Sequence, residues 1–174
     1  MNDNGKFHGT EAIDKFKEVV DHQSVCMFLT ETPHWPEAAR PMSTQKVCDQ
    51  GNFWFLSARS SNKNKAIALD PKVHLLYANT SASDYLSVAG TAEIIDDMAK
   101  KKELWNPIAK AWFPEGVDDP ELTVLKVKPT DGYYWDTKSG KLVSTIMIMA
   151  AAVSGKALDD GIEGTISVVN APTR

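Results

Sequence analysis

The chain has 174 residues, of which 43% are hydrophobic and 24% are charged, and its formal net charge is −4. These values are typical of a globular domain and exclude a largely disordered chain. The acidic balance argues against the basic surface that nucleic acids or an anionic membrane would need, so neither partner is expected. The length fits one domain spanning residues 1–174.

The chain contains two cysteines, Cys26 and Cys48. It has no CxxC pair and no histidine pair at ligand spacing, so neither a metal site nor a disulfide framework is expected. The amino-terminal segment lacks the apolar stretch of a signal peptide, and the longest apolar run, 142–153, is too short to cross a bilayer. These features favour a cytoplasmic protein with reduced thiols.

Four segments carry the 3.6-residue periodicity or the capping residues of a helix. The expected helices cover residues 11–22, 62–69, 97–112 and 142–153. The capping candidates are Thr10 for the first helix, Ser60 or Ser61 for the second, and Asp96 or Asp97 for the third. Pro107 is expected to kink or restart the third helix, because proline cannot donate a backbone hydrogen bond.

Short β-prone runs separated by turn residues predict antiparallel strands. The expected strands cover residues 25–30, 39–47, 53–56, 73–78, 85–95, 122–127 and 132–136. Gly90 indicates a bulge or a close backbone approach, and the Pro-Thr-Asp-Gly sequence at 129–132 predicts a turn. Because few strand–helix–strand units occur, the fold class expected is mainly β, an antiparallel barrel with inserted helices. Residues 1–8 and 165–174 are expected to be loosely ordered.

The positions of the arginines suggest an anion site. The chain has three arginines, and Arg40 and Arg59 fall within one predicted β-meander. The residues that follow at the start of the second helix are Ser60, Ser61, Lys63 and Lys65. Hydroxyls, a helix amino terminus and two ammonium groups can hold a phosphate, and an arginine of a neighbouring strand can add a bidentate contact. The same pattern also occurs at ordinary solvated helix starts.

Other residue types give weaker signals. Aromatic residues gather near residues 54–55, 105–113 and 133–135, where most such side chains serve a core or an interface. The four histidines are scattered, and the chain has no nucleophile elbow, phosphate-binding loop or dinucleotide-binding fingerprint. No residue stands out as a catalytic acid or base, so the sequence leaves the catalytic residues unknown.

Several short motifs, in matching order along the chain, resemble the pyridoxamine 5′-phosphate oxidase-like superfamily of FMN-binding split barrels. These motifs are Arg40-Pro41-Met42, Phe53-Trp54-Phe55-Leu56-Ser57, Ser61-Asn62-Lys63 and Asp70-Pro71-Lys72-Val73. The segment Leu104–Gly116 and the sequence Tyr134-Trp135-Asp136, followed by Gly140-Lys141, are similar to the general stress protein 26 branch. The resemblance covers about residues 9–156.

The resemblance implies a six-stranded antiparallel split β-barrel that pairs as a homodimer with FMN at the interface. The cofactor-binding residues that it implies are Arg40, Pro41, Met42, Phe55, Ser57, Ser61, Lys63, Lys65, Trp112 and Phe113. Among them, Arg40 would contact the phosphate or ribityl end, and Ser61, Lys63 and Lys65 would hold the phosphate. Trp112 and Phe113 would cover the flavin of the same or the other subunit.

The chain departs from the true oxidases where they carry an Arg-x-His element, because residues 133–138 contain neither Arg nor His. Asn62 also stands where the oxidases have an arginine. Pyridoxamine phosphate oxidation is therefore not expected. The resemblance implies a flavin-dependent oxidoreductase acting on an unidentified small molecule. The alternatives are a non-catalytic flavin-binding or flavin-buffering stress protein, and a split barrel that binds heme or a deazaflavin.

Overall fold

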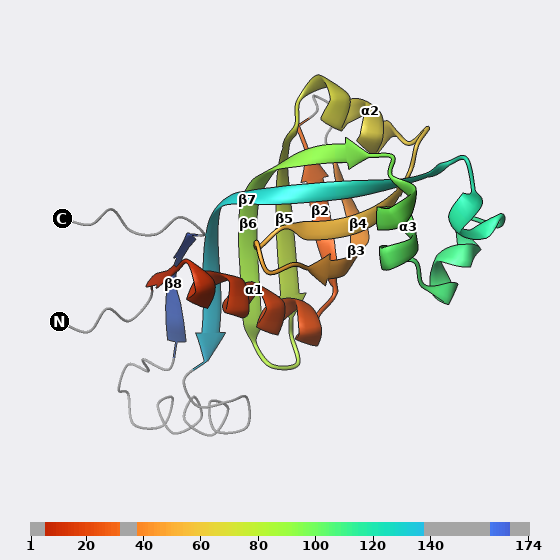
Figure 1. Cartoon of the computed structure of the whole chain (residues 1–174). Coiled ribbons are helices and arrows are strands. Elements are labelled where there is room, and N and C mark those ends of the chain that lie inside the picture. Colours follow the sequence, from red (N-terminus) through yellow and green to blue (C-terminus); the bar gives the residue numbers. More distant parts are fainter. Residues whose placement is uncertain (1–5, 32–37, 138–160, 168–174) are drawn as a thin grey trace, which may run out of the picture.

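The computed structural model describes residues 6–31, 38–137 and 161–167 (Figure 1). Its strands are β1 (Lys6–His8), β2 (Val25–Thr30), β3 (Ala39–Val47), β4 (Phe53–Ala58), β5 (Lys72–Asn79), β6 (Asp84–Ile95), β7 (Leu122–Thr137) and β8 (Gly161–Ser167). Its helices are α1 (Thr10–His22), α2 (Asn62–Leu69) and α3 (Met98–Leu104), followed by the 3₁₀ turns η1 (Pro107–Ala111) and η2 (Gly116–Asp118). The predicted helix over 142–153 lies outside the described residues.

Six of the described strands close into a barrel. The strands follow the order β7-β4-β3-β2-β5-β6, and β6 pairs again with β7, so that the ring has no free edge over its paired length. Every pair in this ring is antiparallel. The predicted fold class, a mainly β antiparallel barrel with six strands and few helices, is therefore confirmed.

The long strand β7 changes its pairing partner partway along its length. Its first half pairs with β4, and its second half, from Gly132 onward, pairs with β8 instead, while β6 stays beside both halves. The predicted turn at 129–132 is wrong, because the chain continues as one strand through it. Pro129 is tolerated there since it lies opposite Gly90, where the β6–β7 register shifts and a ladder hydrogen bond is not required.

Gly90 confirms the predicted bulge and close backbone approach. A Cβ atom at this position would lie 2.6 Å from the carbonyl oxygen of Lys128, which no real side chain tolerates. Only glycine therefore lets β6 and β7 come together at the point where β7 changes partners.

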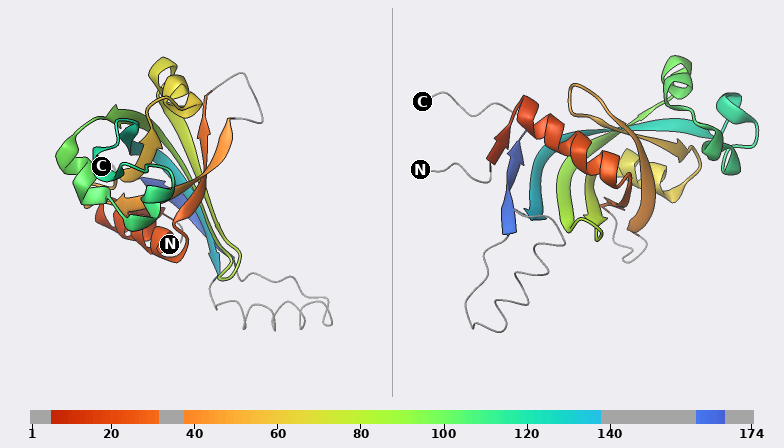
Figure 2. Two further views of the ribbon diagram at one scale, coloured as in Figure 1. Left: turned by 90° about the vertical axis from the view of Figure 1, so that its right-hand side faces the viewer. Right: turned by 90° about the horizontal axis from the view of Figure 1, so that it is seen from below.

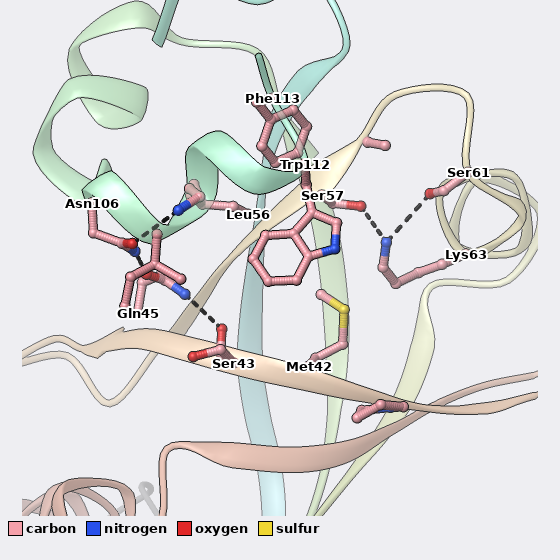
Figure 3. Close-up of a pocket in the computed structure, with 14 residues that line it drawn as sticks. Met42, Ser43, Gln45, Leu56, Ser57, Ser61, Lys63, Asn106, Trp112 and Phe113 are labelled. Atoms are coloured by element: carbon pink, nitrogen blue, oxygen red, sulfur yellow. Dashed lines mark hydrogen bonds between the residues drawn. The ribbon is translucent and has the colours of Figure 1, made fainter. Parts of the chain in front are cut away.

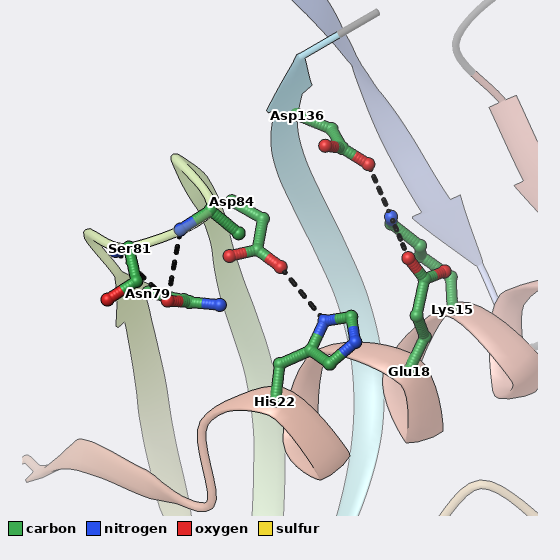
Figure 4. A network of polar contacts seen from close by, with 8 residues as sticks. Lys15, Glu18, His22, Asn79, Ser81, Asp84 and Asp136 are labelled. Atoms are coloured by element: carbon green, nitrogen blue, oxygen red, sulfur yellow. Dashed lines mark hydrogen bonds and ion pairs between the residues drawn. The ribbon is translucent and has the colours of Figure 1, made fainter. Parts of the chain in front are cut away.

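The core fills the barrel with apolar side chains from all six strands and from α1. Phe53 lies at its centre, with ring centroids 5.1 Å from Phe16 of α1 and 6.1 Å from Tyr77 of β5. The helix is held further by two polar contacts, Lys15 to Asp136 at 2.7 Å and the His22 imidazole to Asp84 at 3.3 Å (Figure 4). The apolar face and these contacts fix α1 across the barrel.

The helix ends follow from local chemistry. Ser61 and Asp97 are the caps of α2 and α3, as predicted, because their side chains accept hydrogen bonds from the backbone nitrogens of Asn64 and Lys100. The predicted cap at Thr10 is wrong: α1 already includes Thr10, and the residue before it is Gly9.

The expected helix over 97–112 is shorter than predicted. Helix α3 ends at Leu104, and the chain restarts as η1 after Asn106, because Pro107 disfavours helical backbone in the residue before it. The break turns the segment 105–113 back toward β3 and β4. Strands β1 and β8 were not among the predicted elements. They pair beside the second half of β7, at the opposite end of the molecule from α3 and η1 (Figure 2).

Within the described ranges, no helix has the length and apolar character needed to cross a membrane.

Candidate functional site

A pocket of about 420 Å³ lies between the β3–β4 strands and the segment 105–113, within the size range of small-molecule sites. Its wall also includes the start of α2. The lining residues are Pro41, Met42, Ser43, Gln45, Leu56, Ser57, Ala58, Ser61, Lys63, Asn106, Ile108, Ala109, Trp112 and Phe113. Figure 3 shows Lys63 with Ser57 and Ser61 at one end, Gln45 with Asn106 at the other, and the Trp112 ring between them.

One end of the pocket is cationic. Lys63 lies in the first turn of α2 with only 7% of its surface exposed, and its ammonium group donates hydrogen bonds to Ser57 Oγ and, at 3.3 Å, to Ser61 Oγ. Burial, and to a smaller extent the positive charge of Arg40, together lower the pKa of Lys63 to about 8. Among the described residues, no carboxylate forms an ion pair with Lys63. The amine is thus a buried cation whose neighbours are hydroxyls and a second cation.

A buried network holds this end in shape. Ser57 Oγ donates to Asn64 Oδ1 at 2.6 Å, and Asn64 Nδ2 donates to Thr123 Oγ1 at 3.0 Å. Thr123 Oγ1 in turn donates to the carbonyl oxygen of Ser57 at 2.8 Å. Because the Ser57 hydroxyl hydrogen points to Asn64, its lone pairs face the Lys63 ammonium. The network therefore fixes the position of the cation.

Arg40 stands beside the cationic end on β3. Its guanidinium donates to Thr30 Oγ1 at 3.0 Å, and partial burial lowers its pKa, although arginine stays charged at neutral pH. Two cations in a half-buried site repel each other and lose hydration. An anion between them would relieve both costs, which makes this end suited to a phosphate or a carboxylate.

The other end of the pocket is neutral and polar. Asn106 Nδ2 donates to Gln45 Oε1 at 2.6 Å, while Gln45 Nε2 donates to the carbonyl oxygen of Ser43 at 2.9 Å. Asn106 also caps η1, since its Oδ1 accepts from the Ala109 backbone nitrogen at 3.1 Å. These bonds join β3 to η1.

The middle of the pocket is apolar. Phe113 and Ala109 are buried against Leu122, whereas Ile108 and Trp112 leave 75% and 71% of their surface exposed. Large apolar side chains at this exposure suit contact with a flat ligand or with another protein surface.

The structure brings together seven of the ten cofactor-binding residues suggested by the sequence. Those that line the pocket are Pro41, Met42, Ser57, Ser61, Lys63, Trp112 and Phe113. Arg40 is outside the lining but close enough for its positive charge to lower the pKa of Lys63. Phe55 is not in the lining: it is fully buried in the barrel, with its ring 5.3 Å from Phe28. Lys65 is exposed on α2 and also lies outside the lining.

Sequence reasoning missed Ser43, Gln45 and Asn106 of the lining, and Asn64 behind it. Ser43 and Gln45 could have been predicted from the sequence. Successive side chains of a strand point to opposite faces, so both residues share a face of β3 with Pro41. Asn106 carried the signal of a cap before a proline at the start of a turn. The partners of these side chains lie far away in sequence.

The described residues contain no group of three or more histidine, cysteine or acidic side chains placed to hold a metal ion. Lys63 is the one ionisable side chain among the described residues of the lining. The pocket therefore offers anion binding, amide hydrogen bonds and apolar contact, and the lining holds no acid–base pair.

A closed six-stranded antiparallel barrel, with a pocket on β3 and β4 beside a capped helix, defines the chain as a split barrel. The sequence pattern of the family described as "Pyridoxamine 5′-phosphate oxidase like" matches residues 11–159. The chain belongs to this family.

Similar proteins agree with that assignment. General stress protein 26 of Bacillus subtilis is 33% identical over 122 residues, which are 67% of this chain and 83% of that protein. Protein bli-3 of Neurospora crassa is 26% identical over 110 residues, 59% of this chain, and the match spans only 53% of that relative's length.

Solved structures agree in fold. A Jannaschia sp. CCS1 protein assigned to general stress protein 26 superposes with a TM-score of 0.74 at 24% identity, over 88% of this chain and 96% of that one. A Xanthomonas citri protein named as a general stress FMN/FAD binding protein superposes with a TM-score of 0.64 at 24% identity, over 74% of this chain and 91% of that one.

Proposed function

We propose that the pocket binds FMN, with its phosphate at the cationic end. The observation that carries this proposal is Lys63, a cation that is 7% exposed, hydrogen-bonded to two hydroxyls and free of any carboxylate ion pair within the described residues. A charge in such a place is costly unless a ligand neutralises it. Arg40 and Ser61 supply further donors for a dianionic phosphate.

The rest of the pocket fits the rest of this cofactor. Its apolar middle, between Met42 and Trp112, suits a flat aromatic ring, and the neutral amides at the far end suit polar ring edges. The motifs around Arg40 and Ser61 resemble those of FMN-binding split barrels, and a protein of the same fold is named for binding FMN or FAD.

We further propose that the protein is a flavin-dependent oxidoreductase acting on a small molecule. Support comes from the described part of the lining, which holds one ionisable side chain and so is poorly suited to hydrolysis or other acid–base chemistry. Bound FMN supplies hydride and electron transfer, which side chains alone do not provide. The residues of the chain would bind, orient and shield it. Turnover of a nicotinamide donor with an electron acceptor separates this function from simple flavin binding.

A second copy of the chain is the partner we propose. On the outer face of the barrel, Met27 is 41% exposed and lies opposite Leu76, which is 40% exposed, on one side and the pocket residue Pro41 on the other. Because this apolar strip is continuous with the pocket wall, a homodimer through it would cover the strip and complete the site at the same time.

Fluorescence titration of the cofactor-free protein tests the FMN proposal. The wild type should bind FMN about tenfold or more tightly than riboflavin, which lacks the phosphate. Lys63→Met should weaken FMN about 10–100-fold and leave riboflavin unchanged. Lys65→Met, on the same helix but exposed, is the matched control and should change neither. Equal affinity of the wild type for the two flavins would refute the phosphate site, and a heme absorption band in the purified protein would refute FMN.

A further inference from the structure

The two amide side chains at the neutral end of the pocket are held in fixed orientations. Gln45 comes from β3 and Asn106 from the cap of η1, and each makes one hydrogen bond to the other and one to backbone. Their mutual bond, 2.6 Å from Asn106 Nδ2 to Gln45 Oε1, sets the two amide groups side by side on the pocket wall.

Each of these amides keeps unused hydrogen-bonding capacity. A primary amide has two N–H donors and two acceptor lone pairs. Gln45 uses one donor on Ser43 and one lone pair on Asn106, and Asn106 uses one donor on Gln45 and one lone pair on Ala109. Within residues 6–31, 38–137 and 161–167, the remaining N–H groups and lone pairs have no protein partner. Both side chains are half-buried and line the pocket, so these groups are available to a ligand as pre-oriented donors and acceptors.

We propose that Gln45 and Asn106 bind the pyrimidinedione edge of the flavin ring, and thereby set the direction in which the cofactor lies. The inference rests on the proposed FMN site. That edge presents a carbonyl, an N–H and a second carbonyl in a row, and two fixed amides supply both donors and acceptors to match it.

The spacing along β3 agrees with this orientation. Met42 lies near the cationic end and Gln45 is three residues further along the strand, which corresponds to ~10 Å. The flavin ring would lie over this interval, with the ribityl chain and phosphate toward Lys63 and the polar ring edge at the amides. A heme has no edge with a carbonyl, an N–H and a second carbonyl in a row. The Gln45–Asn106 pair therefore favours a flavin over a heme.

Isosteric variants test the pair directly. Gln45→Glu and Asn106→Asp keep the shape of each side chain, and aspartate remains a good cap for η1. Each replaces a donor with a negative charge facing ring carbonyls, so each should weaken FMN, riboflavin and lumiflavin alike, by about tenfold. The control is Gln50→Glu, an exposed glutamine at the β3–β4 turn, which should bind all three flavins as the wild type does. Thermal melts check that each variant is folded.

The pattern across ligands separates this inference from the phosphate site. The Lys63 substitution is expected to affect FMN alone, whereas the amide substitutions are expected to affect every ligand that carries the ring. The folded amide variants contradict this inference if they bind riboflavin and lumiflavin within twofold of the wild type, or if they lose affinity for FMN only. In either case the amide pair does not bind the ring edge, and the proposed FMN site is unaffected. If the wild type binds no flavin, both the proposed function and this inference fail.

Discussion

The ammonium group of Lys63 donates a hydrogen bond to Ser57 Oγ from a side chain that is only 7% exposed. The hydroxyl cannot neutralise the charge, and Arg40 adds a second positive charge nearby. The cofactor-free protein thus holds a buried cation that contributes little to its stability. Such an arrangement is typical of binding sites, where local instability before binding increases the gain when the ligand arrives.

The first prediction concerns the stability of the cofactor-free protein. The pKa of Lys63 falls from 10.5 in the unfolded chain to about 8 in the fold, so folding penalises the charged form. Lys63→Met should therefore be more stable than the wild type at pH 7, by about 1 kcal/mol after the loss of the hydrogen bonds to Ser57 and Ser61.

Urea denaturation across a pH series measures this difference. Between pH 8 and pH 10.5 the unfolded chain binds the Lys63 proton and the folded chain does not, so wild-type stability rises with pH relative to the variant. The advantage of Lys63→Met should accordingly shrink through that window. A variant less stable than the wild type at pH 7, or an advantage that grows with pH, contradicts the prediction.

A second prediction concerns the pH dependence of FMN binding. Since Lys63 loses its proton near pH 8 in the cofactor-free protein, FMN affinity should fall above that pH, approaching tenfold per pH unit. Lys63→Arg keeps its charge throughout and should flatten the curve, and riboflavin binding should stay level in both proteins. Titrations at pH 7, 8 and 9 suffice, and parallel curves for FMN and riboflavin would exclude Lys63 as the phosphate ligand.

The network behind the cation gives a third prediction. Thr123→Val keeps the shape of a fully buried side chain but leaves Asn64 Nδ2 and the Ser57 carbonyl oxygen without their partner. The variant should lose about 1–3 kcal/mol of stability. Thr130→Val, on the same strand and exposed, removes a hydroxyl contact of 3.2 Å to Ala89 and should cost less than about 0.5 kcal/mol. Equal costs in the two variants would show that the network does not support the fold.

The features that the sequence predicted correctly depend on residues close together in the chain, whereas the features that it missed depend on residues far apart in the chain. Local sequence determines the caps at Ser61 and Asp97 and the strand 39–47, which carries Arg40. These elements were predicted correctly. The contact of Asn106 with Gln45 joins residues 61 positions apart, and no local pattern indicates it. The continuity of β7 through Pro129 likewise depends on Gly90 of another strand.

Gly90 itself supplies a fourth prediction. Gly90→Ala should cost about 2–4 kcal/mol, because its Cβ would lie 2.6 Å from the Lys128 carbonyl oxygen and backbone must move. Gly116→Ala is the comparison: its φ is +80°, but no atom lies within 4 Å of the added carbon, so only about 1 kcal/mol of backbone strain is expected. Chemical denaturation of both variants measures the difference, and a Gly90 variant no less stable than the Gly116 variant contradicts the close approach.

The last prediction tests the homodimer through its proposed strip. Light scattering should give a mass near twice 19.2 kDa for the wild type at micromolar concentration. Met27→Glu places a charge in the strip between Leu76 and Pro41, where burial against a second copy would be costly, and should yield the monomer. Met98→Glu is a matched control, since Met98 on α3 is also 41% exposed, and it should remain dimeric. If the second copy completes the pocket, Met27→Glu should also bind FMN more weakly, whereas Met98→Glu should not. A wild type that is monomeric, or a Met27 variant that stays dimeric, excludes this strip as the interface.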